Sequence, residues 1–377
     1  MSVRRRMSAG RSVKALTLTA AALLAGVLAV AASGSSRAGI EAELAKLTKT
    51  NAVVMPKPTT PVAVGKHEVA VIAVGLAVPG ANYTARYVQS AIKLAGWTAK
   101  PTYDGQFQPA VASGQIQDAI NSGVDGIILI SFDPATISAA LAQANEKNVP
   151  VICILCGPPS VIAKFPGVTG IEPSPTLTGR AQALYALHAG GPKADIWVYE
   201  DKEFPFTVVQ TAVAIKELRN RCKACKVHVV QMTAAQSAEP GLPILAGVLA
   251  RYRQKGSIDV IIAPWDGPAA GFATLLQQRG RTEVSVVGYA GLAEFVSQIK
   301  AGFPKPAKAT VAIPLPYAGY SAVDQLARRF ANQPVWNGQS LGVSLITTEN
   351  YKRLYSKSVW TSPGFDPAAF FAKLWKK

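Results

Sequence analysis

The sequence predicts an α/β protein in which two doubly wound parallel-sheet domains form a hinged clamshell. Apolar runs such as Gly126–Ile130 and Val151–Ile154 are typical of parallel strands buried on both faces. Between these runs lies a segment with helical apolar spacing, for which Asp133 and Pro134 suit the N-cap and the first turn. A chain of 377 residues is also too long for one ordinary core, so two domains are expected.

The same alternation of strand and helix continues along the chain. In the first half we expect strands at residues 68–74, 98–104, 126–130 and 151–154, and helices at residues 83–95, 111–122 and 135–148. In the second half we expect strands at residues 195–199, 227–232, 260–263, 284–289, 309–313 and 342–346, and helices at residues 176–189, 207–221, 242–254, 268–278, 292–301 and 317–332. Repeated βα units of this kind predict one parallel sheet per domain.

The N-terminus has the three parts of a secretory signal. Five basic residues precede an Ala-rich apolar segment at residues 15–32, and Ala29–Ala31 provides small residues for cleavage. A permanent membrane anchor is the alternative. Because no Cys precedes Cys153, a lipid-anchored N-terminus is excluded. We therefore expect a soluble exported protein located in the periplasm.

The domain boundaries follow from these elements. We expect a signal peptide at residues 1–33 and a linker at residues 34–66, where a short helix-prone piece precedes a loosely ordered Pro/Thr-rich stretch. The N-terminal domain would comprise residues 66–157 with 314–345. The C-terminal domain and tail would comprise residues 158–313 with 346–377.

The composition excludes several other classes of protein. Hydrophobic residues make up 49% of the chain and charged residues 16%, which is typical of a packed globular protein and not of a disordered one. Without the five cations of the signal segment, the formal net charge falls from +17 to +12. Because the remaining Lys and Arg are scattered and the chain is exported, we expect a solvated basic surface and no nucleic-acid partner.

The four cysteines form two Cys-x-x-Cys pairs. Cys222 and Cys225 lie between a helix and a strand, and export to an oxidising compartment favours a structural disulfide between them. Cys153 and Cys156 lie at the end of a buried strand. For them we expect free thiols in the core, with a strained local bridge as the alternative.

Motifs for catalysis are missing or incomplete. The Gly338–Gly342 stretch matches a nucleophile elbow, but the fold that uses this motif needs a later His, and His67, His188 and His228 all precede it. No His pair has metal-ligand spacing, and there is no phosphate-binding loop or dinucleotide fingerprint. We therefore expect neither an enzyme nor a cofactor, although an unrecognised periplasmic activity stays an alternative.

A family resemblance rests on the central stretch. Gly123-Val-Asp-Gly-Ile127, the apolar run, Asp133, and Ala144-Asn-Glu-Lys-Asn-Val-Pro-Val-Ile152 resemble the ribose-type (type I) periplasmic binding proteins, the solute receptors of ABC importers. The resemblance extends from about residue 66 to about residue 351. It implies a sugar or sugar-like ligand in an interdomain cleft at the strand ends, an ABC permease as partner and a monomer. A sensory receptor of the same fold is the second hypothesis.

The sequence departs from the sugar-binding pattern of this family at most strand ends. Asp133 is retained as the polar anchor. The family's Asp-Arg-Gly is replaced here by Leu155-Cys156-Gly157, its Asn-Asp by Trp265-Asp266, and its Phe-Asp-Gly by Tyr289-Ala290-Gly291. Ile313-Pro314 stands where the family has glutamines, and Val78-Pro79-Gly80-Ala81 stands where it has Asn-Pro-Phe-Phe. A buried hydroxyl without a partner costs about 2–7 kcal/mol, so binding of a free hexose or pentose cannot be assumed.

Three kinds of ligand contact follow as hypotheses. Trp265 and Tyr289 would stack on a large apolar face, or else fill core or hinge space. Asp266 would contact the ligand or cap a helix. Replacement polar groups could come from Glu200, Asp201 and Glu203, or these could be solvated. We therefore expect the ligand-binding set to include Asp133, Trp265, Asp266, Tyr289, Cys156, Pro314 and Pro79.

Overall fold

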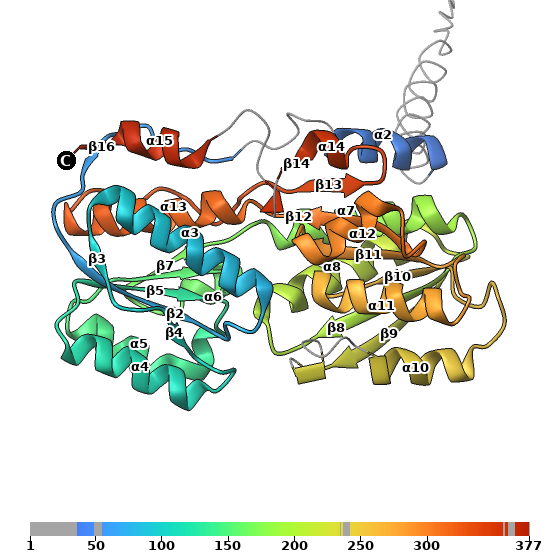
Figure 1. Cartoon of the computed structure of the whole chain (residues 1–377), viewed down its shortest axis with the longest axis horizontal. Coiled ribbons are helices and arrows are strands. Elements are labelled where there is room, and N and C mark those ends of the chain that lie inside the picture. Colours follow the sequence, from blue (N-terminus) through green and yellow to red (C-terminus); the bar gives the residue numbers. More distant parts are fainter. Residues whose placement is uncertain are drawn as a thin grey trace, which may run out of the picture.

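The computed structural model of the chain describes residues 36–48, 55–233, 235–236, 242–356, 359–360 and 366–376. Within this part the chain forms two lobes, each built on a six-stranded sheet with helices on both faces (Figure 1). The predicted α/β class with two doubly wound parallel sheets is therefore confirmed. The predicted signal peptide lies outside the described residues, and none of the described helices is long and apolar enough to cross a bilayer.

The first sheet has the order β3-β2-β5-β6-β7, and its strands are parallel. They are β2 (Glu68–Ala73), β3 (Thr98–Ala99), β5 (Gly126–Ile130), β6 (Val151–Ile154) and β7 (Val168–Ile171), with β4 (Tyr103–Asp104) also paired to β2. Helices α3 (Pro79–Ala95) and α13 (Leu315–Phe330) cover one face, and α4 (Pro109–Asn121) and α5 (Ser138–Glu146) cover the other (Figure 1). The lobe therefore has three layers around one buried core.

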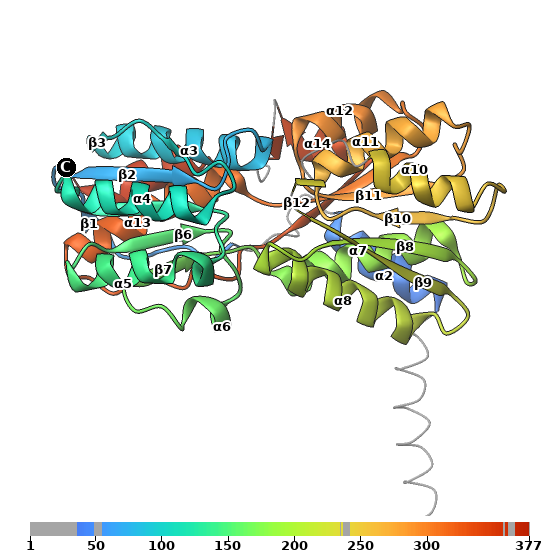
Figure 2. The ribbon, with the colours of Figure 1, turned by 90° about the horizontal axis from the view of Figure 1, so that it is seen from below.

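The second sheet has the order β13-β12-β11-β10-β8-β9, parallel except for the antiparallel edge strand β13. Its strands are β8 (Asp195–Asp201), β9 (Lys226–Met232), β10 (Val260–Ile262), β11 (Ser285–Ala290), β12 (Ala307–Ala312) and β13 (Ser344–Thr347). Helices α7 (Pro175–Gly190) and α8 (Pro205–Arg221) lie on one face, and α10 (Leu242–Arg251), α11 (Asp266–Gln278) and α12 (Ala293–Ala301) on the other (Figure 2). Each face buries its own apolar cluster.

Between β2 and β13 the described chain crosses between the lobes three times. The chain passes to the second lobe after β7, returns after β12 through Pro314 to α13, and passes back before β13. Each connection begins or ends at the edge where the two lobes meet (Figure 2). Such an arrangement is typical of hinged domains that close around a ligand.

Several elements differ from the prediction. The strand expected at residues 98–104 is two short strands, because Pro101 lies between them and has no N–H for a sheet. Short helix α6 (Pro159–Ile162) and strand β7 fall within residues 158–313, which were expected in the C-terminal domain, but β7 pairs with the first sheet. Strand β13 pairs with the second sheet, although residues up to 345 were expected in the N-terminal domain.

The tail also differs. Helix α14 (Tyr351–Leu354) packs beside β13, and β14 (Tyr355–Ser356) pairs with β15 (Val359–Trp360). Helix α15 (Pro367–Leu374) then packs against α13, and β16 (Trp375–Lys376) pairs with β1 (Val62–Ala63). Phe371 and Trp375 are buried in the first lobe because their rings pack with Tyr320. The end of the chain therefore belongs to the first lobe, not the second.

The segment expected to be a loosely ordered linker is packed where it is described. Helix α2 (Arg37–Leu47) buries Ile40 and Leu44 on the second lobe. Its Glu43 accepts hydrogen bonds from Arg180 at 2.5 Å and from Arg221 at 2.9 Å, and this pairing lowers the pKa of the Glu43 carboxyl against the opposing effect of its burial. Apolar burial and ion pairing together therefore order this segment.

Candidate ligand-binding site

A cavity of about 90 Å³ lies between the lobes at the carboxyl ends of both sheets. Its walls from the first lobe are Val74, Val78, Gly80, Ala81, Phe107, Ser131 and Leu155. Its walls from the second lobe are Phe204, Phe206, Thr207, Trp265, Tyr289, Ala290 and Leu292, and Ile313 and Leu315 line it from the connection between the lobes. Open α/β sheets bind ligands at this edge, so the cavity is the candidate site.

Backbone strain is concentrated on the cavity walls. Phe107, Ser131, Leu155 and Ala290 have φ values of 56°, 63°, 58° and 108°, in the region that side-chain-bearing residues seldom occupy. The last three stand at the ends of β5, β6 and β11. Strain of this kind costs of order 1–3 kcal/mol per residue and clusters at binding sites. The strand ends of both lobes are therefore shaped for something other than stability.

Phe107 reaches the cavity through a local turn. The Asp104 carboxylate accepts hydrogen bonds from the backbone N–H of Leu76 at 3.1 Å and of Gln106 at 3.0 Å, which fixes the loop after β4. The Phe107 ring then lies against Gly75, where a Cβ atom would come within 2.5 Å of the ring. Glycine at residue 75 therefore allows the ring to cover the end of β2.

The second lobe provides four more aromatic walls, from Phe204, Phe206, Trp265 and Tyr289. The Trp265 ring lies over Gly267, where a Cβ atom would approach it to 2.2 Å. Phe206 and Tyr289 stack with their ring centroids 4.9 Å apart and their planes at 18°. Burial raises the pKa of the Tyr289 phenol well above its ordinary value, and the nearby Glu172 and Asp266 act in the same direction. Tyr289 therefore stays protonated at neutral pH.

Of the predicted site residues, the structure brings Trp265 and Tyr289 together on the cavity wall. Five others, Asp133, Asp266, Cys156, Pro314 and Pro79, are not among the described lining residues. Pro79, Cys156 and Pro314 are each adjacent in sequence to a residue that lines it. A ligand contact by these five residues stays a prediction.

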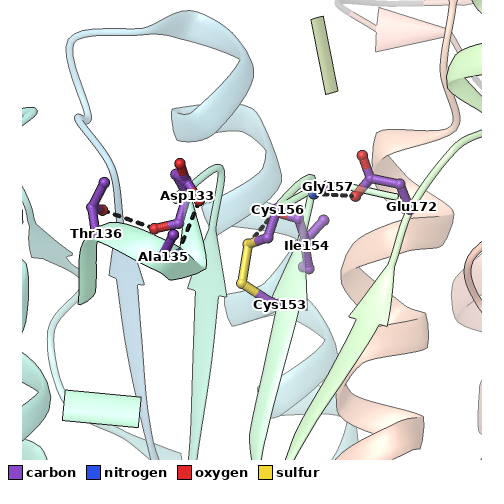
Figure 3. The surroundings of a disulfide bond; sticks show 8 residues. All are labelled: Asp133, Ala135, Thr136, Cys153, Ile154, Cys156, Gly157 and Glu172. Carbon is purple, nitrogen blue, oxygen red and sulfur yellow. Dashed lines mark hydrogen bonds between the residues drawn. A yellow bond between two sulfur atoms is a disulfide. The ribbon is translucent and has the colours of Figure 1, made fainter. Parts of the chain in front are cut away.

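Asp133 has a local structural partner. Its carboxylate accepts a hydrogen bond from the backbone N–H of Ala135 at 3.0 Å, and its carbonyl accepts one from the hydroxyl of Thr136 at 2.8 Å (Figure 3). Asp133 is thus the N-cap of the short helix at Pro134–Ile137. This is the alternative role that its position before Pro134 predicts.

Asp266 is buried behind the Trp265 wall. Its carboxylate accepts hydrogen bonds from the backbone N–H of Leu292 at 2.6 Å and from the hydroxyl of Thr310 at 2.7 Å. Burial raises the pKa of the carboxyl well above its ordinary value, although these hydrogen bonds oppose the shift. Asp266 therefore joins α11 to β12 and to the loop after β11.

Both cysteine pairs are disulfides. The bond between Cys222 and Cys225 confirms the prediction, whereas the bond between Cys153 and Cys156 shows that the expectation of free thiols is wrong (Figure 3). The positive φ of Leu155 turns the chain after β6 and places the Cα atoms of Cys153 and Cys156 5.7 Å apart, within reach of a disulfide. This turn also directs Leu155 to the cavity.

Glu172 is a residue of the site region that the sequence analysis missed. It is fully buried where the chain leaves β7 for the second lobe, and its carboxylate accepts a hydrogen bond from Gly157 N–H at 3.4 Å (Figure 3). Its Oε1 atom has no hydrogen-bond partner among the described residues. Burial raises the pKa of this carboxyl well above its ordinary value. The sequence gives little signal for this residue, because the strand before it, β7, is short and contains Gly170.

The proposed replacement polar groups do not line the cavity in the described part of the chain. Asp201 is buried, accepts a hydrogen bond from Glu203 N–H at 3.1 Å, and its carbonyl accepts one from the Thr207 hydroxyl at 2.5 Å. Glu200 lies 3.9 Å from Lys202. No cluster of three or more metal-ligating side chains occurs among the described residues.

Sequence relatives agree with the resemblance. The chain is 20% identical over 191 residues to the xylitol-binding protein of Mycolicibacterium smegmatis, covering 50% of this chain and 52% of that protein. It is 23% identical over 192 residues to the ribose import binding protein RbsB of Escherichia coli, covering 50% and 60%. The chain thus spans only about half to three fifths of these two relatives.

Solved structures share the fold over most of their length. An ABC sugar transporter subunit from Rhodobacter sphaeroides gives a TM-score of 0.67 at 22% identity, covering 75% of this chain and 99% of that one. The Caulobacter myo-inositol binding protein, solved with myo-inositol, gives 0.67 at 22% identity, covering 76% and 95%. Residues 69–334 match the family described as periplasmic binding protein domain, and the chain belongs to that family.

Proposed function

We propose that this protein is an extracytoplasmic solute-binding protein that captures a small molecule between its lobes and delivers it to an ABC permease. The observation that carries the proposal is the strained backbone of Phe107, Ser131, Leu155 and Ala290, contributed by both lobes to one cavity. A structural scaffold alone has no need of such strain at the strand ends. Family membership supports the same function.

Capture requires the lobes to move. The cavity of about 90 Å³ is smaller than the cavity of about 150 Å³ that holds benzene in an engineered protein, so the lobes lie closer together here than they would around a ring-sized ligand. The lobes are in contact here: Gly80 is close to Leu292, and Gly157 is close to Pro205. We infer that the described arrangement is the closed one.

The relatives set the reference class of ligand. The names of the sequence relatives and solved structures mention xylitol, ribose and myo-inositol, which makes sugars and polyols the first compounds to test on this chain. Delivery to a permease fits these relatives better than the alternatives of a sensory receptor or a periplasmic enzyme. We infer binding without a chemical step, and a monomer as the working state.

A direct experiment tests capture without assuming a ligand class. The protein is purified from its native host under gentle conditions, denatured, and the released small molecules are identified by mass spectrometry. Small-angle scattering is then measured with and without the released compound. A stoichiometric compound that makes the protein more compact supports the proposal. An empty protein that stays unchanged with the host's growth substrates contradicts it.

Export is tested on the same material. We propose that residues 1 to about 31 are removed and that the mature protein is soluble in the periplasm. The tripartite N-terminus carries this proposal. Intact-mass measurement of the native protein should show the loss. A full-length chain in the membrane fraction would contradict it and would favour a permanent anchor.

A further inference from the structure

The cavity walls differ chemically from a site for polyhydroxylated ligands. Five of the lining side chains are aromatic: Phe107, Phe204, Phe206, Trp265 and Tyr289. Among the described lining residues none carries a charge. Apolar walls gain free energy from burying apolar ligand surface and none from an isolated hydroxyl.

The polar groups on the walls are few and partly used. The Thr207 hydroxyl donates to the backbone carbonyls of Asp201 at 2.5 Å and of Phe204 at 2.9 Å, so it is left only as an acceptor. Trp265 lines the cavity, and its Nε1, which is itself buried in this arrangement, has no acceptor among the described residues. The hydroxyls of Ser131 and Tyr289 also belong to lining residues, so the walls match a ligand with one or two oxygen groups better than one with many hydroxyls.

Two buried acids of the site region have hydrogen-bond partners within the protein. Asp266 is bound by Leu292 N–H and the Thr310 hydroxyl, and Glu172 accepts a hydrogen bond from Gly157 N–H. Both are fully buried, and neither lines the cavity. They therefore provide neither hydrogen-bond acceptors for ligand hydroxyls nor a negative charge for a cationic ligand at the cavity walls.

We propose that the ligand of this cavity is a neutral molecule with an apolar ring, aromatic or alicyclic, and one or two oxygen groups. This inference rests on the proposed function and narrows its ligand class. The aromatic walls cover the ring faces, and the unpaired N–H of Trp265 becomes a donor for a ligand oxygen once the lobes separate enough to admit the ring. A free polyol would bury hydroxyls without partners, each of which lowers affinity by roughly tenfold or more.

Two matched pairs of probes test this ligand class on the mature protein. Cyclohexanol and myo-inositol share a six-carbon ring and differ by five hydroxyl groups. Benzyl alcohol and benzoate share an aromatic ring, and only benzoate is charged at neutral pH. Binding is measured by calorimetry and by ligand-observed NMR. We expect cyclohexanol and benzyl alcohol to bind at least tenfold more tightly than myo-inositol and benzoate.

One wall variant should shift this preference. Ala290 lines the cavity with φ 108°, and Asn tolerates positive φ better than most residues that carry a side chain. Ala290→Asn adds a donor and an acceptor to the wall, so it should weaken cyclohexanol binding at least threefold and strengthen myo-inositol binding. Ala139→Asn changes an exposed residue of α5 and should alter neither affinity.

The Trp265 donor has its own test. Trp265→Phe keeps an aromatic wall and removes the N–H group. We expect it to weaken benzyl alcohol binding by about fivefold to tenfold. Binding of toluene, which has the same ring without an oxygen, should change less than twofold. Equal losses for the two compounds would show that Trp265 acts only as a surface.

The outcomes separate this inference from the proposed function. Tighter binding of myo-inositol than of cyclohexanol overturns the ligand class and supports solute binding. Binding of benzoate at least as tight as that of benzyl alcohol overturns neutrality. Binding of no probe, together with an empty protein from the native host, overturns both. Binding of no probe by a protein that carries a host compound overturns the inference if that compound is a sugar, another polyol or an ion. It supports the inference if the compound is neutral and has an apolar ring with one or two oxygen groups.

Discussion

The hydroxyl of Thr310 donates a 2.7 Å hydrogen bond to the carboxylate of Asp266, and this contact joins β12 to the start of α11. The same carboxylate also accepts a hydrogen bond from the backbone N–H of Leu292 at 2.6 Å. It therefore holds together three segments of the second lobe next to Trp265, which lines the cavity. Because burial raises its pKa well above the ordinary value, protonation and packing are coupled at this position.

Asp266→Ala should lower the free energy of unfolding by about 3 kcal/mol or more, because it leaves two buried donors without an acceptor. Asp266→Asn keeps an acceptor for one donor and can itself donate to Thr310 Oγ1. It should therefore lose much less stability. Urea unfolding of the three proteins measures the difference. A stable Asn variant with greatly weakened ligand binding would show that Asp266 touches the ligand, as the sequence analysis predicts.

Removal of the two disulfides should have different effects on binding. Each closes a loop with a sequence separation of 3, so the loop-closure contribution of each is about 2 kcal/mol. Cys222→Ser with Cys225→Ser should leave ligand affinity unchanged, because this pair does not line the cavity. Cys153→Ser with Cys156→Ser should weaken it, because this pair holds the turn at Leu155.

Calorimetry with the host compound identified by mass spectrometry compares the two double variants. Peptide mapping without reductant on the native protein confirms both bonds first. Equal affinities in the two variants would contradict a role for the Leu155 turn in shaping the site.

Two possible roles of Asp133, helix cap and ligand anchor, can be separated by substitution. Asp133→Ala should lower the free energy of unfolding by about 1 kcal/mol, because Ala135 N–H loses its acceptor. Asp133→Asn keeps a good N-cap and should be nearly as stable as the wild type. If Asp133 also anchors the ligand, both variants lose affinity, by about tenfold to a hundredfold. If it only caps, affinity stays unchanged in both, and calorimetry decides between these outcomes.

Sequence patterns predict the sheets better than the site. The runs Gly126–Ile130 and Val151–Ile154 are fully buried, so their continuous apolar character reports the fold directly. Trp265 and Tyr289 line the cavity, as their position at the carboxyl ends of parallel strands predicts. The strand-end rule therefore transfers from sequence to structure for these residues.

Other features depend on contacts between distant segments. The hydrogen-bond partners of Asp266 lie 26 and 44 residues further along the sequence, and no local sequence pattern predicts them. Strand β7 is short and contains Gly170, so its apolar signal is too weak to distinguish it from a loop. The Cys153–Cys156 bond depends on the positive φ of Leu155, which a leucine does not predict.

The last prediction concerns pH and the buried carboxyl of Glu172. Its folded pKa is raised well above the ordinary value of 4.5, chiefly by burial, so the folded protein holds this proton more tightly than the unfolded chain does. The corresponding contribution to stability is complete below pH 4.5 and is lost as the pH rises through the folded pKa. Asp266 has the same sign, so each acid accounts for part of the slope.

Glu172→Gln removes one titrating group and keeps an acceptor for Gly157 N–H. The melting temperature of the wild type should therefore fall more steeply than that of the variant as the pH rises above about 5. Glu146→Gln changes an exposed carboxylate at the end of α5 and should leave the slope unchanged. Thermal unfolding in a buffer series at constant ionic strength gives the three slopes. Parallel curves of melting temperature against pH for the wild type and Glu172→Gln would contradict the prediction. They would mean that Glu172 holds its proton no more tightly in the folded state than in the unfolded chain. Water would then reach its unpartnered Oε1 atom.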